Sequence, residues 1–388
     1  FQSASPMNEP DPSMKYWGAN SNKQEGCHFA PGTSQSKIIK ALNEELKSKA
    51  AAATDEGVKA ALNNIIFSGT DETSIDLTIS SYNALDNDTK KVIERIDTHT
   101  YGGSKRAELR ALAEKEGKNL WMSEVDGAYV AGTSAGEMGA ALGLAQQIMK
   151  DLNGMKASAW ILWNAVDNHV DSNNGADKWP FGNDYKTTEE LFKKVDLTKG
   201  YWGLAFGDHN EHKLILTKKY YGFGQFSRYI RPGYSLMGTS DEANTLVAYD
   251  TQGKQAVIVA VNTAQDDKTW EFDLSRFESI GTISAHRTSG ALENGENWAD
   301  LTAAQVNAKA NAANRTFTAT VKGNSITTFV VDNVTYDKEK SEERSRREEN
   351  LKKMQMEYVS VEDFSKVDLA GNKIALTESM ISGSDPWN

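Results

Sequence analysis

Two glutamates in this sequence stand where paired carboxylates could act on one substrate. Glu124 ends the apolar part of segment 119–127, which has the composition of a short buried strand followed by a turn. Glu9 lies in segment 5–10, where Pro10 stops the chain from continuing as a paired strand. Each glutamate therefore lies at the carboxyl end of a predicted strand, where barrel enzymes hold their catalytic residues. Two such carboxylates are what the hydrolysis of a glycosidic bond requires.

The charge balance of the chain bears on its partners. The 388 residues include 43 Lys and Arg against 54 Asp and Glu, which gives a net charge of −11. No basic block stands out before the carboxyl-terminal tail, and phosphate binding needs clustered positive charge. This argues against nucleic acid and anionic membranes as partners and favours a neutral substrate such as a sugar. Cys27 is the one cysteine, so no intrachain disulfide can form.

The sequence shows neither a membrane span nor a signal peptide. No run approaches the roughly 20 apolar residues that a spanning helix needs. Residues 1–5 lack the charged start and the apolar core of a signal peptide. Because a candidate catalytic residue occurs nine positions from the first residue, we expect this sequence to be a slice of a longer polypeptide.

Strands and helices are predicted to alternate through residues 1–238. Five short apolar segments are predicted as buried strands, and they end near Glu9, Ser68, Tyr101, Glu124 and Trp163. The predicted helices cover about 36–50, 88–95, a stretch capped by Ser104, 138–149 with a capping box at Ser134 and Glu137, and 218–229. Unbroken apolar strands in this order are typical of a parallel α/β sheet.

A (β/α)8 TIM barrel needs eight strand–helix units, whereas this sequence contains five. The five would be strands 4–8, so residues 1–238 are predicted to form the second half only of a catalytic TIM barrel. The N-terminal half of the barrel, with its first three strands, is then expected upstream of this sequence.

The pattern changes to β-branched or alternating segments between turn residues near Asp241. The predicted strands are 245–249, 255–262, 269–274, 280–287, 315–321 and 325–334. No convincing helix separates most of them, so residues 239–335 are predicted to form an antiparallel β-sandwich. Residues 336–388 are predicted to be a charged linker or helix, followed by the start of a truncated further module.

Four motifs occur in an order that resembles glycoside hydrolase family 30. They are Asn8-Glu9-Pro10, Gln24-Glu25-Gly26-Cys27-His28-Phe29, His99-Thr100-Tyr101 and Leu120-Trp121-Met122-Ser123-Glu124-Val125-Asp126-Gly127. The similarity is closest to the endo-β-1,6-galactanase branch and covers about residues 1–335. The Asn-Glu-Pro motif recurs in many barrel glycosidases, whereas the last motif is much more specific.

The resemblance implies a role for each matched position. Glu9 would be the general acid/base and Glu124 the nucleophile of a retaining glycosidase. Asn8 would bind the sugar 2-hydroxyl, and His99 and Tyr101 would flank the nucleophile. The same resemblance implies that the indole of Trp163, at the end of the last predicted strand, would be a platform under the sugar ring.

The chemistry sets geometric and electrostatic expectations for this pair. Retention requires the two carboxyl groups to lie about 5–5.5 Å apart, whereas inversion needs about 6.5–9.5 Å. Strand ends four and seven of one barrel face each other, so Glu9 and Glu124 are expected to meet. We expect a raised pKa for Glu9, helped by repulsion from Glu124, which should remain ionised. A hydroxyl donated by Tyr101 would hold the Glu124 carboxylate in its attacking position.

Other polar residues have more than one interpretation. Glu72 is predicted to touch substrate or to brace a loop, and His99 has the alternative of a hydrogen-bonded core histidine. His209 and His212 lie three residues apart, but a polar loop explains them better than a metal site. We therefore predict no metal and no cofactor.

The sequence favours a secreted, extracellular enzyme that cleaves β-1,6-linked galactan, such as arabinogalactan side chains, by a retaining two-glutamate mechanism. The partner is then a polysaccharide or oligosaccharide. One alternative keeps the mechanism and changes the sugar to β-1,6-glucan or xylan. The other is a non-catalytic carbohydrate-binding surface protein, which paired glutamates pointing away from each other would favour.

Overall fold

The computed structural model describes residues 3–10, 28–127, 137–170, 172, 184–190, 202–250, 252–336 and 373–377. The chain divides into two compact units. The first comprises Phe1–Asp126 and Gly154–Trp163, and the second comprises Gly127–Asn153 and Asn164–Asn388. None of the helices in the described part of the chain has the length and apolarity to cross a membrane.

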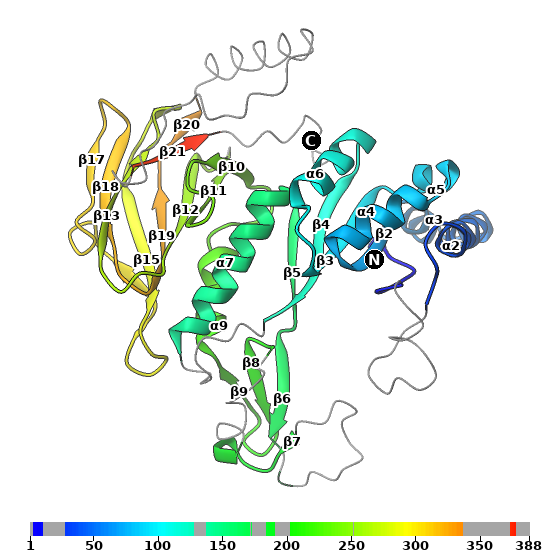
Figure 1. The fold of residues 1–388 in the computed structure, drawn as a ribbon, viewed down its shortest axis with the longest axis horizontal. Coiled ribbons are helices and arrows are strands. Elements are labelled where there is room, and N and C mark those ends of the chain that lie inside the picture. Colours follow the sequence, from blue (N-terminus) through cyan, green and yellow to red (C-terminus); the bar gives the residue numbers. More distant parts are fainter. Residues whose placement is uncertain are drawn as a thin grey trace. The chain divides into compact units, whose positions relative to one another are not determined.

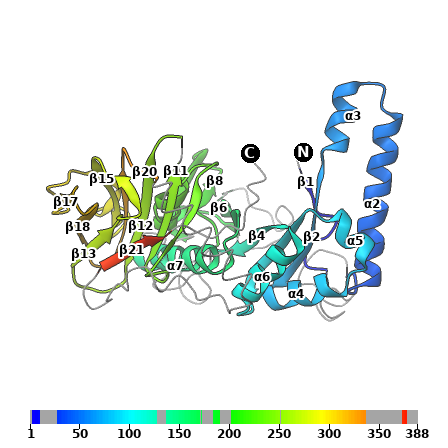
Figure 2. The same ribbon diagram turned by 90° about the horizontal axis from the view of Figure 1, so that it is seen from above.

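A curled parallel sheet forms the centre of the first unit (Figure 1). Its strands follow one another in chain order: β1 (Ser3–Ala4), β2 (Ile66–Ser74), β3 (Arg95–Gly102), β4 (Asn119–Asp126) and β5 (Ala159–Trp163). The helices between them are α2 (Thr33–Ala52), α3 (Glu56–Asn63), α4 (Ile75–Ala84), α5 (Asn87–Val92) and α6 (Arg106–Glu116). Figure 2 shows α2 and α3 side by side, and α2 also contacts β2. The five predicted strand segments therefore form one parallel sheet.

Side chains alternate between the two faces of each strand, so apolar and polar side chains of one strand can lie on opposite faces. On β3, Ile96 is fully buried, whereas Arg95, Asp97 and His99 occupy the alternate positions. Arg95 donates two hydrogen bonds to Asp97, at 2.6 and 2.9 Å, and its guanidinium lies 3.6 Å from the centre of the Trp121 ring. The alternate face of β3 is thus a buried polar face, which leads along the strand to His99.

Several local predictions for this unit were wrong. Strand β2 continues to Ser74 instead of ending near Ser68, so Asp71 and Glu72 lie within it. Helix α4 was not predicted; it begins after Ser74, whose hydroxyl accepts the Leu77 N–H at 3.4 Å. The helix expected at 88–95 is α5, which ends at Val92 because β3 starts at Arg95.

The predicted helix cap at Ser104 is also wrong. Helix α6 begins after Lys105, and no side chain of its own first turn caps it. Instead the Asp76 carboxylate accepts the N–H groups of Ser104 and Lys105, each at 3.3 Å. The predicted capping box at residues 134 and 137 lies partly outside the described residues.

The second unit contains helices α7 (Met138–Met155) and α9 (Lys218–Ser227), both near their predicted positions. A small four-stranded sheet has the order β7 (Asp184–Tyr185), β6 (Val166–Val170), β8 (Ala205–Asp208) and β9 (Lys213–Leu216). This sheet lies between the predicted strand that ends near Trp163 and the predicted helix 218–229, where no strand is predicted from the sequence.

A ten-stranded sheet follows α9, and all its pairs are antiparallel except that of β13 with β21. In sheet order its strands are β16 (Glu296–Leu301), β15 (Ile283–Ser289), β19 (Ser325–Val331), β12 (Gln255–Asn262), β11 (Thr245–Asp250), β10 (Ser235–Thr239), β21 (Lys373–Thr377), β13 (Lys268–Asp273), β18 (Thr316–Val321) and β17 (Lys309–Asn311). Strands β14 (Phe277–Ser279) and β20 (Thr335–Tyr336) pair separately. The rings of Phe272 and Phe317 stack 4.5 Å apart in the core, close to Phe329.

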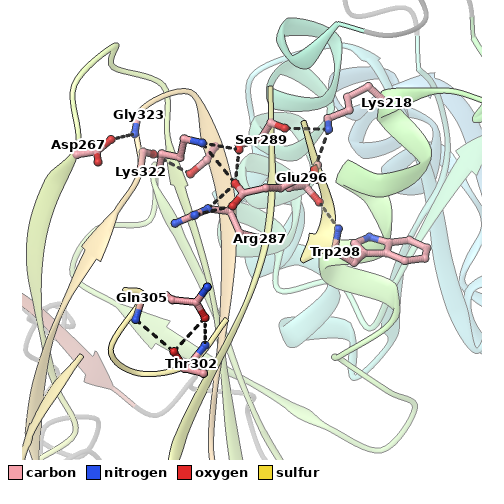
Figure 3. A network of polar contacts seen from close by, with 12 residues as sticks. Lys218, Asp267, Arg287, Ser289, Glu296, Trp298, Thr302, Gln305, Lys322 and Gly323 are labelled. Atoms are coloured by element: carbon pink, nitrogen blue, oxygen red, sulfur yellow. Dashed lines mark hydrogen bonds and ion pairs between the residues drawn. The ribbon is translucent and has the colours of Figure 1, made fainter. Parts of the chain in front are cut away.

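A polar network ties α9 to the β15–β16 hairpin (Figure 3). Glu296 receives two hydrogen bonds from Arg287, both at 2.6 Å, and a further bond from the Ser289 hydroxyl. Lys322 lies 3.1 Å from Ser289 Oγ and 3.5 Å from Glu296 Oε2. Burial opposes the charge of Glu296, but the hydrogen bonds from Arg287 and Ser289 prevail and lower its pKa to about 2.

Lys218 of α9 is fully buried among oxygen acceptors of this hairpin. Its Nζ donates to Ser289 O at 3.0 Å, Glu296 O at 2.8 Å and Asn297 Oδ1 at 2.7 Å. Burial lowers the pKa of Lys218 to about 8, although the Glu296 charge opposes this shift. One ammonium group therefore supplies donors to three acceptors that its loss would leave unpaired.

Replacing this ammonium should destabilise the protein measurably. Lys218→Met keeps the length of the side chain but leaves the buried acceptors without a donor, a cost of about 1–3 kcal/mol. We expect the free energy of unfolding in urea to fall by about that amount. Lys268→Met, on the exposed side of β13, is the matched control and should leave stability nearly unchanged. Equal stability of the two variants would contradict this account.

Candidate active site

The carboxyl ends of β1 to β4 bring several titratable side chains together within the first unit. Glu9 follows β1, Asp71 lies in β2, His99 and Tyr101 lie in β3, and Glu124 lies in β4. His99 pairs in register with Glu124 across β3 and β4. Because parallel strands place their carboxyl ends at one edge of a sheet, residues far apart in sequence become neighbours here.

The two predicted catalytic glutamates meet across one histidine. His99 Nδ1 lies 3.0 Å from Glu9 Oε1 and 3.8 Å from Glu124 Oε1. One ligand atom from each of Glu9, His99 and Glu124 can be chosen so that all three lie within 4.8 Å of one another. Side chains of Glu9 and His99 are almost completely buried, whereas that of Glu124 is 19% exposed. One carboxylate is thus partly open to solvent, and the other is enclosed.

Backbone geometry fixes the position of Glu9. Its φ is +46° and that of Asp71 is +59°, a left-handed region that residues other than glycine seldom occupy. The Glu9 N–H donates to the Asp71 carbonyl at 2.9 Å, which joins these two residues. Such conformations cost about 1–3 kcal/mol each and cluster at functional sites, where surrounding contacts maintain them.

Three carboxylates surround His99. Burial disfavours a charged imidazole, but the Asp71 and Glu9 carboxylates outweigh it, helped by Glu124, and raise the pKa of His99 to about 10. His99 Nε2 lies 3.5 Å from Asp71 Oδ1, so both ring nitrogens face a carboxylate. The carboxylates on both sides of the ring therefore favour the protonated form of His99.

Glu124 is held by the hydroxyl of Tyr101. That hydroxyl donates to Glu124 Oε1 at 2.9 Å, as the sequence led us to expect. Burial raises the pKa of Glu124, while the His99 charge and the Tyr101 hydrogen bond act in the opposite direction. Burial and the Glu124 charge also raise the pKa of Tyr101, which keeps its hydroxyl protonated as a donor.

Asp71 connects three strands at this site and was missed in the sequence. Its Oδ1 accepts the Ser123 hydroxyl at 2.6 Å, next to Glu124 in the chain, and lies close to His99. The sequence signal was present, since an acidic pair follows an apolar run at residues 71–72. The strand was predicted to end near Ser68, however, which left Asp71 and Glu72 just past its end.

Glu72 is not brought to the other site residues. Its side chain is fully buried and accepts hydrogen bonds from Gln35 Nε2 at 2.8 Å and Ser81 Oγ at 2.6 Å. These partners belong to α2 and α4, so Glu72 braces the helices. Of the alternatives for this residue, the structure favours bracing over contact with substrate.

The two remaining predicted residues lie at the surface near the site. Asn8 is exposed and precedes Glu9. Trp163 ends β5, is 48% exposed and pairs in register with Asp126 of β4. An exposed indole at a strand end leaves a flat apolar face available to a ligand.

A metal ion is the other ligand that this geometry could accommodate. In the described part of the chain, the group with suitable spacing is that of Glu9, His99 and Glu124, whereas His209 and His212 belong to no such group. A histidine must be neutral to coordinate a metal. The carboxylates around His99 favour its protonated form, so a metal would have to compete with a proton for the ring nitrogen.

The Tyr101 hydrogen bond can be tested without any substrate. Tyr101→Phe removes a donor that favours the ionised form, so the already raised pKa of Glu124 should rise further. Carboxyl ¹³C titration by NMR measures this shift, with the signal identified by its loss in Glu124→Gln. Tyr82→Phe, which removes a hydroxyl 3.4 Å from Glu116, is the control and should not move it. An unchanged Glu124 titration in Tyr101→Phe would contradict the assignment.

Curated proteins similar to this chain include an endo-β-1,6-galactanase and an exo-β-1,6-galactobiohydrolase. An endo-β-1,6-galactanase from Hypocrea rufa is 30% identical over 339 residues, which are 86% of this chain and 57% of that protein. An exo-β-1,6-galactobiohydrolase from Bifidobacterium longum subsp. longum is 24% identical over 278 residues, 68% of this chain and 17% of that protein. The resemblance predicted from the motifs is confirmed, although this chain spans little more than half of the galactanase.

Solved structures similar to this one include family 30 glycoside hydrolases. The Xyn30A xylanase from Clostridium acetobutylicum, of family 30 subfamily 8, has a TM-score of 0.55 and 20% identity. A family 30 endoxylanase from Clostridium papyrosolvens has a TM-score of 0.51 and 20% identity. The match covers 86% of this chain and 66% of each xylanase. At this identity the comparison shows a shared α/β fold. No family model matches the chain.

Proposed function

We propose, starting from the homology to an endo-β-1,6-galactanase, that this chain takes part in hydrolysis of β-1,6-linked galactan with retention of anomeric configuration. Arabinogalactan side chains are substrates of this type. The observation that supports the proposal most is the pair of carboxylates, Glu9 and Glu124, whose oxygens approach within 4.8 Å beside His99. An approach of their oxygens to within 4.8 Å is compatible with the roughly 5–5.5 Å between the carboxyl groups of retaining glycosidases and supports retention over inversion, which needs about 6.5–9.5 Å.

The first step transfers the sugar to the protein. Glu124 attacks the anomeric carbon while Glu9 gives its proton to the departing glycosidic oxygen. Tyr101 donates to Glu124 Oε1 and leaves the other oxygen of the carboxylate free of that bond. The partly exposed position of Glu124 suits a group that must reach substrate, and the enclosed position of Glu9 suits one that must hold a proton.

The second step releases the sugar. Water attacks the anomeric carbon, Glu9 accepts the water's proton, and the bond between the sugar and Glu124 breaks. Two inversions at the same carbon give net retention. No metal or cofactor takes part in either step.

Substrate contacts follow from the placement of the remaining residues. Asn8 is exposed beside Glu9 and would bind the sugar 2-hydroxyl. Trp163 offers an exposed indole at the end of β5, on which the C–H face of a sugar ring can stack. His99 and Tyr101 flank the nucleophile from β3. Glu72 has no place in this set because it braces α2 and α4.

The proposal includes the larger protein. The five-stranded sheet corresponds in order to strands 4–8 of a TIM barrel, with the first strands contributed by sequence upstream of this chain. Residues 239–335 would form a β-sandwich, whereas the prediction for residues 336–388 lies almost entirely outside the described residues. A polysaccharide substrate of this kind places the protein outside the cell, secreted or at the cell surface.

The decisive experiment measures substrate and stereochemistry together. The full-length polypeptide is incubated with β-1,6-galacto-oligosaccharides, and ¹H NMR follows the first anomer released. We expect the β-anomer to appear first and the α-anomer to form later by mutarotation. The α-anomer as first product would contradict retention.

A polysaccharide panel distinguishes the alternatives. Cleavage of β-1,6-galactan in preference to β-1,6-glucan and xylan is the expected result. Preference for either of the other polymers would keep the mechanism and change the substrate. Binding of galactan without hydrolysis of any polymer would favour a non-catalytic carbohydrate-binding protein.

A further inference from the structure

We propose that Asp71 is a positioning residue that keeps a proton on His99 Nε2, so that His99 Nδ1 and Glu9 share the proton given to the leaving group. The catalytic acid is then a pair of side chains rather than Glu9 alone. This inference rests on the proposed function and adds a proton path to it.

The contacts of His99 require an extra proton. A neutral imidazole has one N–H and can donate from one nitrogen only. Here Nδ1 lies 3.0 Å from Glu9 Oε1, and Nε2 lies 3.5 Å from Asp71 Oδ1. Unless a proton lies between Nδ1 and Glu9, a lone pair of the ring would face a carboxylate in a buried site. That proton belongs either to His99 or to the Glu9 carboxyl group, along the same 3.0 Å line.

Asp71 determines which nitrogen exchanges its proton. Its carboxylate faces Nε2 and attracts a proton there, which leaves Nδ1 as the nitrogen that exchanges with Glu9. Its carbonyl accepts the Glu9 N–H at 2.9 Å, and its Oδ1 accepts the Ser123 hydroxyl at 2.6 Å. Asp71, on β2, thus fixes the positions of Glu9 and His99 relative to each other. It does not itself contact a reacting atom.

The carboxylates that face His99 come from three neighbouring segments of the described chain. Glu9 approaches from the segment after β1, Asp71 from β2 and Glu124 from β4, while Tyr101 of β3 stacks edge-on at 5.8 Å. Burial opposes the charge on His99, but the carboxylates prevail and raise its pKa to about 10. Removing the negative charge of Asp71 should therefore make His99 lose its proton at lower pH.

The proton balance closes over one catalytic cycle. In the first step Glu9 gives a proton to the glycosidic oxygen, and the pair of Glu9 and His99 becomes negative by one charge. Nε2 keeps its proton throughout. In the second step Glu9 takes one proton from the attacking water, and the pair again shares a single proton between Glu9 Oε1 and His99 Nδ1.

Asp71→Asn is the variant that tests this inference, because it keeps the shape and the backbone carbonyl but removes the charge. We expect kcat on β-1,6-galacto-oligosaccharides to fall about tenfold to a hundredfold, with KM within about twofold. The basic limb of the pH profile should move to lower pH by about one unit or more. Asp88→Asn, on exposed α5, is the control and should change neither quantity. A fall in kcat with the pH profile unmoved would indicate a purely structural role and overturn the inference.

Substrate-free NMR supplies the second readout. In the ¹⁵N-histidine-labelled protein, the His99 signals are identified by their loss in His99→Gln. We expect His99 to titrate well above the ordinary imidazole pKa in the wild type and closer to it in Asp71→Asn. A wild-type His99 that titrates as an ordinary imidazole overturns the inference even where Asp71→Asn fails to fold. Failure to cleave galactan, with the expected His99 titration, would overturn the proposed function and leave the proton placement standing.

Discussion

Glu124→Gln should abolish turnover of β-1,6-galacto-oligosaccharides, with kcat lower by a factor on the order of 10⁴ to 10⁶. The amide has the shape of the carboxylate but lacks the charge and the nucleophilicity to form the bond to the anomeric carbon. Its oxygen can still accept the Tyr101 hydroxyl, now 2.9 Å from Glu124 Oε1, so the side chain should keep its place. Initial rates measured by reducing-sugar release and product chromatography check the loss.

The control for this variant removes a glutamate that lies on the same sheet but outside the site. Glu72→Gln changes a buried carboxylate bonded to Gln35 and Ser81, and we expect it to lower stability more than turnover. Circular dichroism and thermal unfolding of Glu124→Gln should match the wild type. Wild-type turnover in a correctly folded Glu124→Gln would remove the nucleophile assignment.

Glu9→Ala should show a different pattern, because it removes the proton donor and leaves the nucleophile. For natural galacto-oligosaccharides, kcat should fall about 10²- to 10⁴-fold, the usual contribution of a general acid. An aryl galactoside with a good leaving group needs little protonation, so it should still form the covalent intermediate. The intermediate then accumulates because no base activates the water, and a burst of phenol release should precede a slow steady state.

Azide separates this role from mere loss of packing. A small anionic nucleophile can occupy the space left by the Glu9 side chain and attack the intermediate without general-base help. The rate with the aryl galactoside should increase with azide concentration, and the product should be a β-galactosyl azide. Glu124→Gln must show no such rescue. Absence of rescue in a folded Glu9→Ala protein would contradict the assignment of Glu9 as acid/base.

The sequence revealed the two glutamates because each ends an apolar segment and stands in a recognisable motif. It showed an acidic pair at residues 71–72 but not the contacts of Asp71. Polar residues at 71–74 look like a loop, yet β2 continues through them because Gln35 and Ser81 satisfy the Glu72 carboxylate and Ser123 satisfies Asp71. Those partners lie far away in the chain, so the hydrophobic periodicity of residues 66–74 does not indicate them.

Other misses have equally specific causes. Helix α4 buries four residues with helical spacing, Ile75, Thr78, Ser81 and Tyr82. Because Thr78 and Ser81 are polar, the sequence lacks the continuous apolar stripe that predicts an amphipathic helix. Strands β16 and β17 form the two outer edges of the ten-stranded sheet. Edge strands are short and polar, so they lack the alternation that identified the central strands. The protonation of His99 is likewise a property of three carboxylates that only folding brings together.

The two glutamates lie in different backbone settings, because Glu124 lies within β4 and Glu9 lies in the segment that follows β1. Among the described residues, β1 pairs with β2 through Ser3 and Ala4 alone, whereas the eight-residue β4 lies between β3 and β5. Local opening begins where few backbone bonds must break. In mild denaturant the segment with Glu9 should detach first, its amides exchanging with solvent while those of β4 remain protected. Activity toward natural galactan should then disappear at a lower denaturant concentration than activity toward aryl galactosides. The stability of the Glu9 segment, rather than that of the strand with Glu124, would therefore limit activity under partial unfolding.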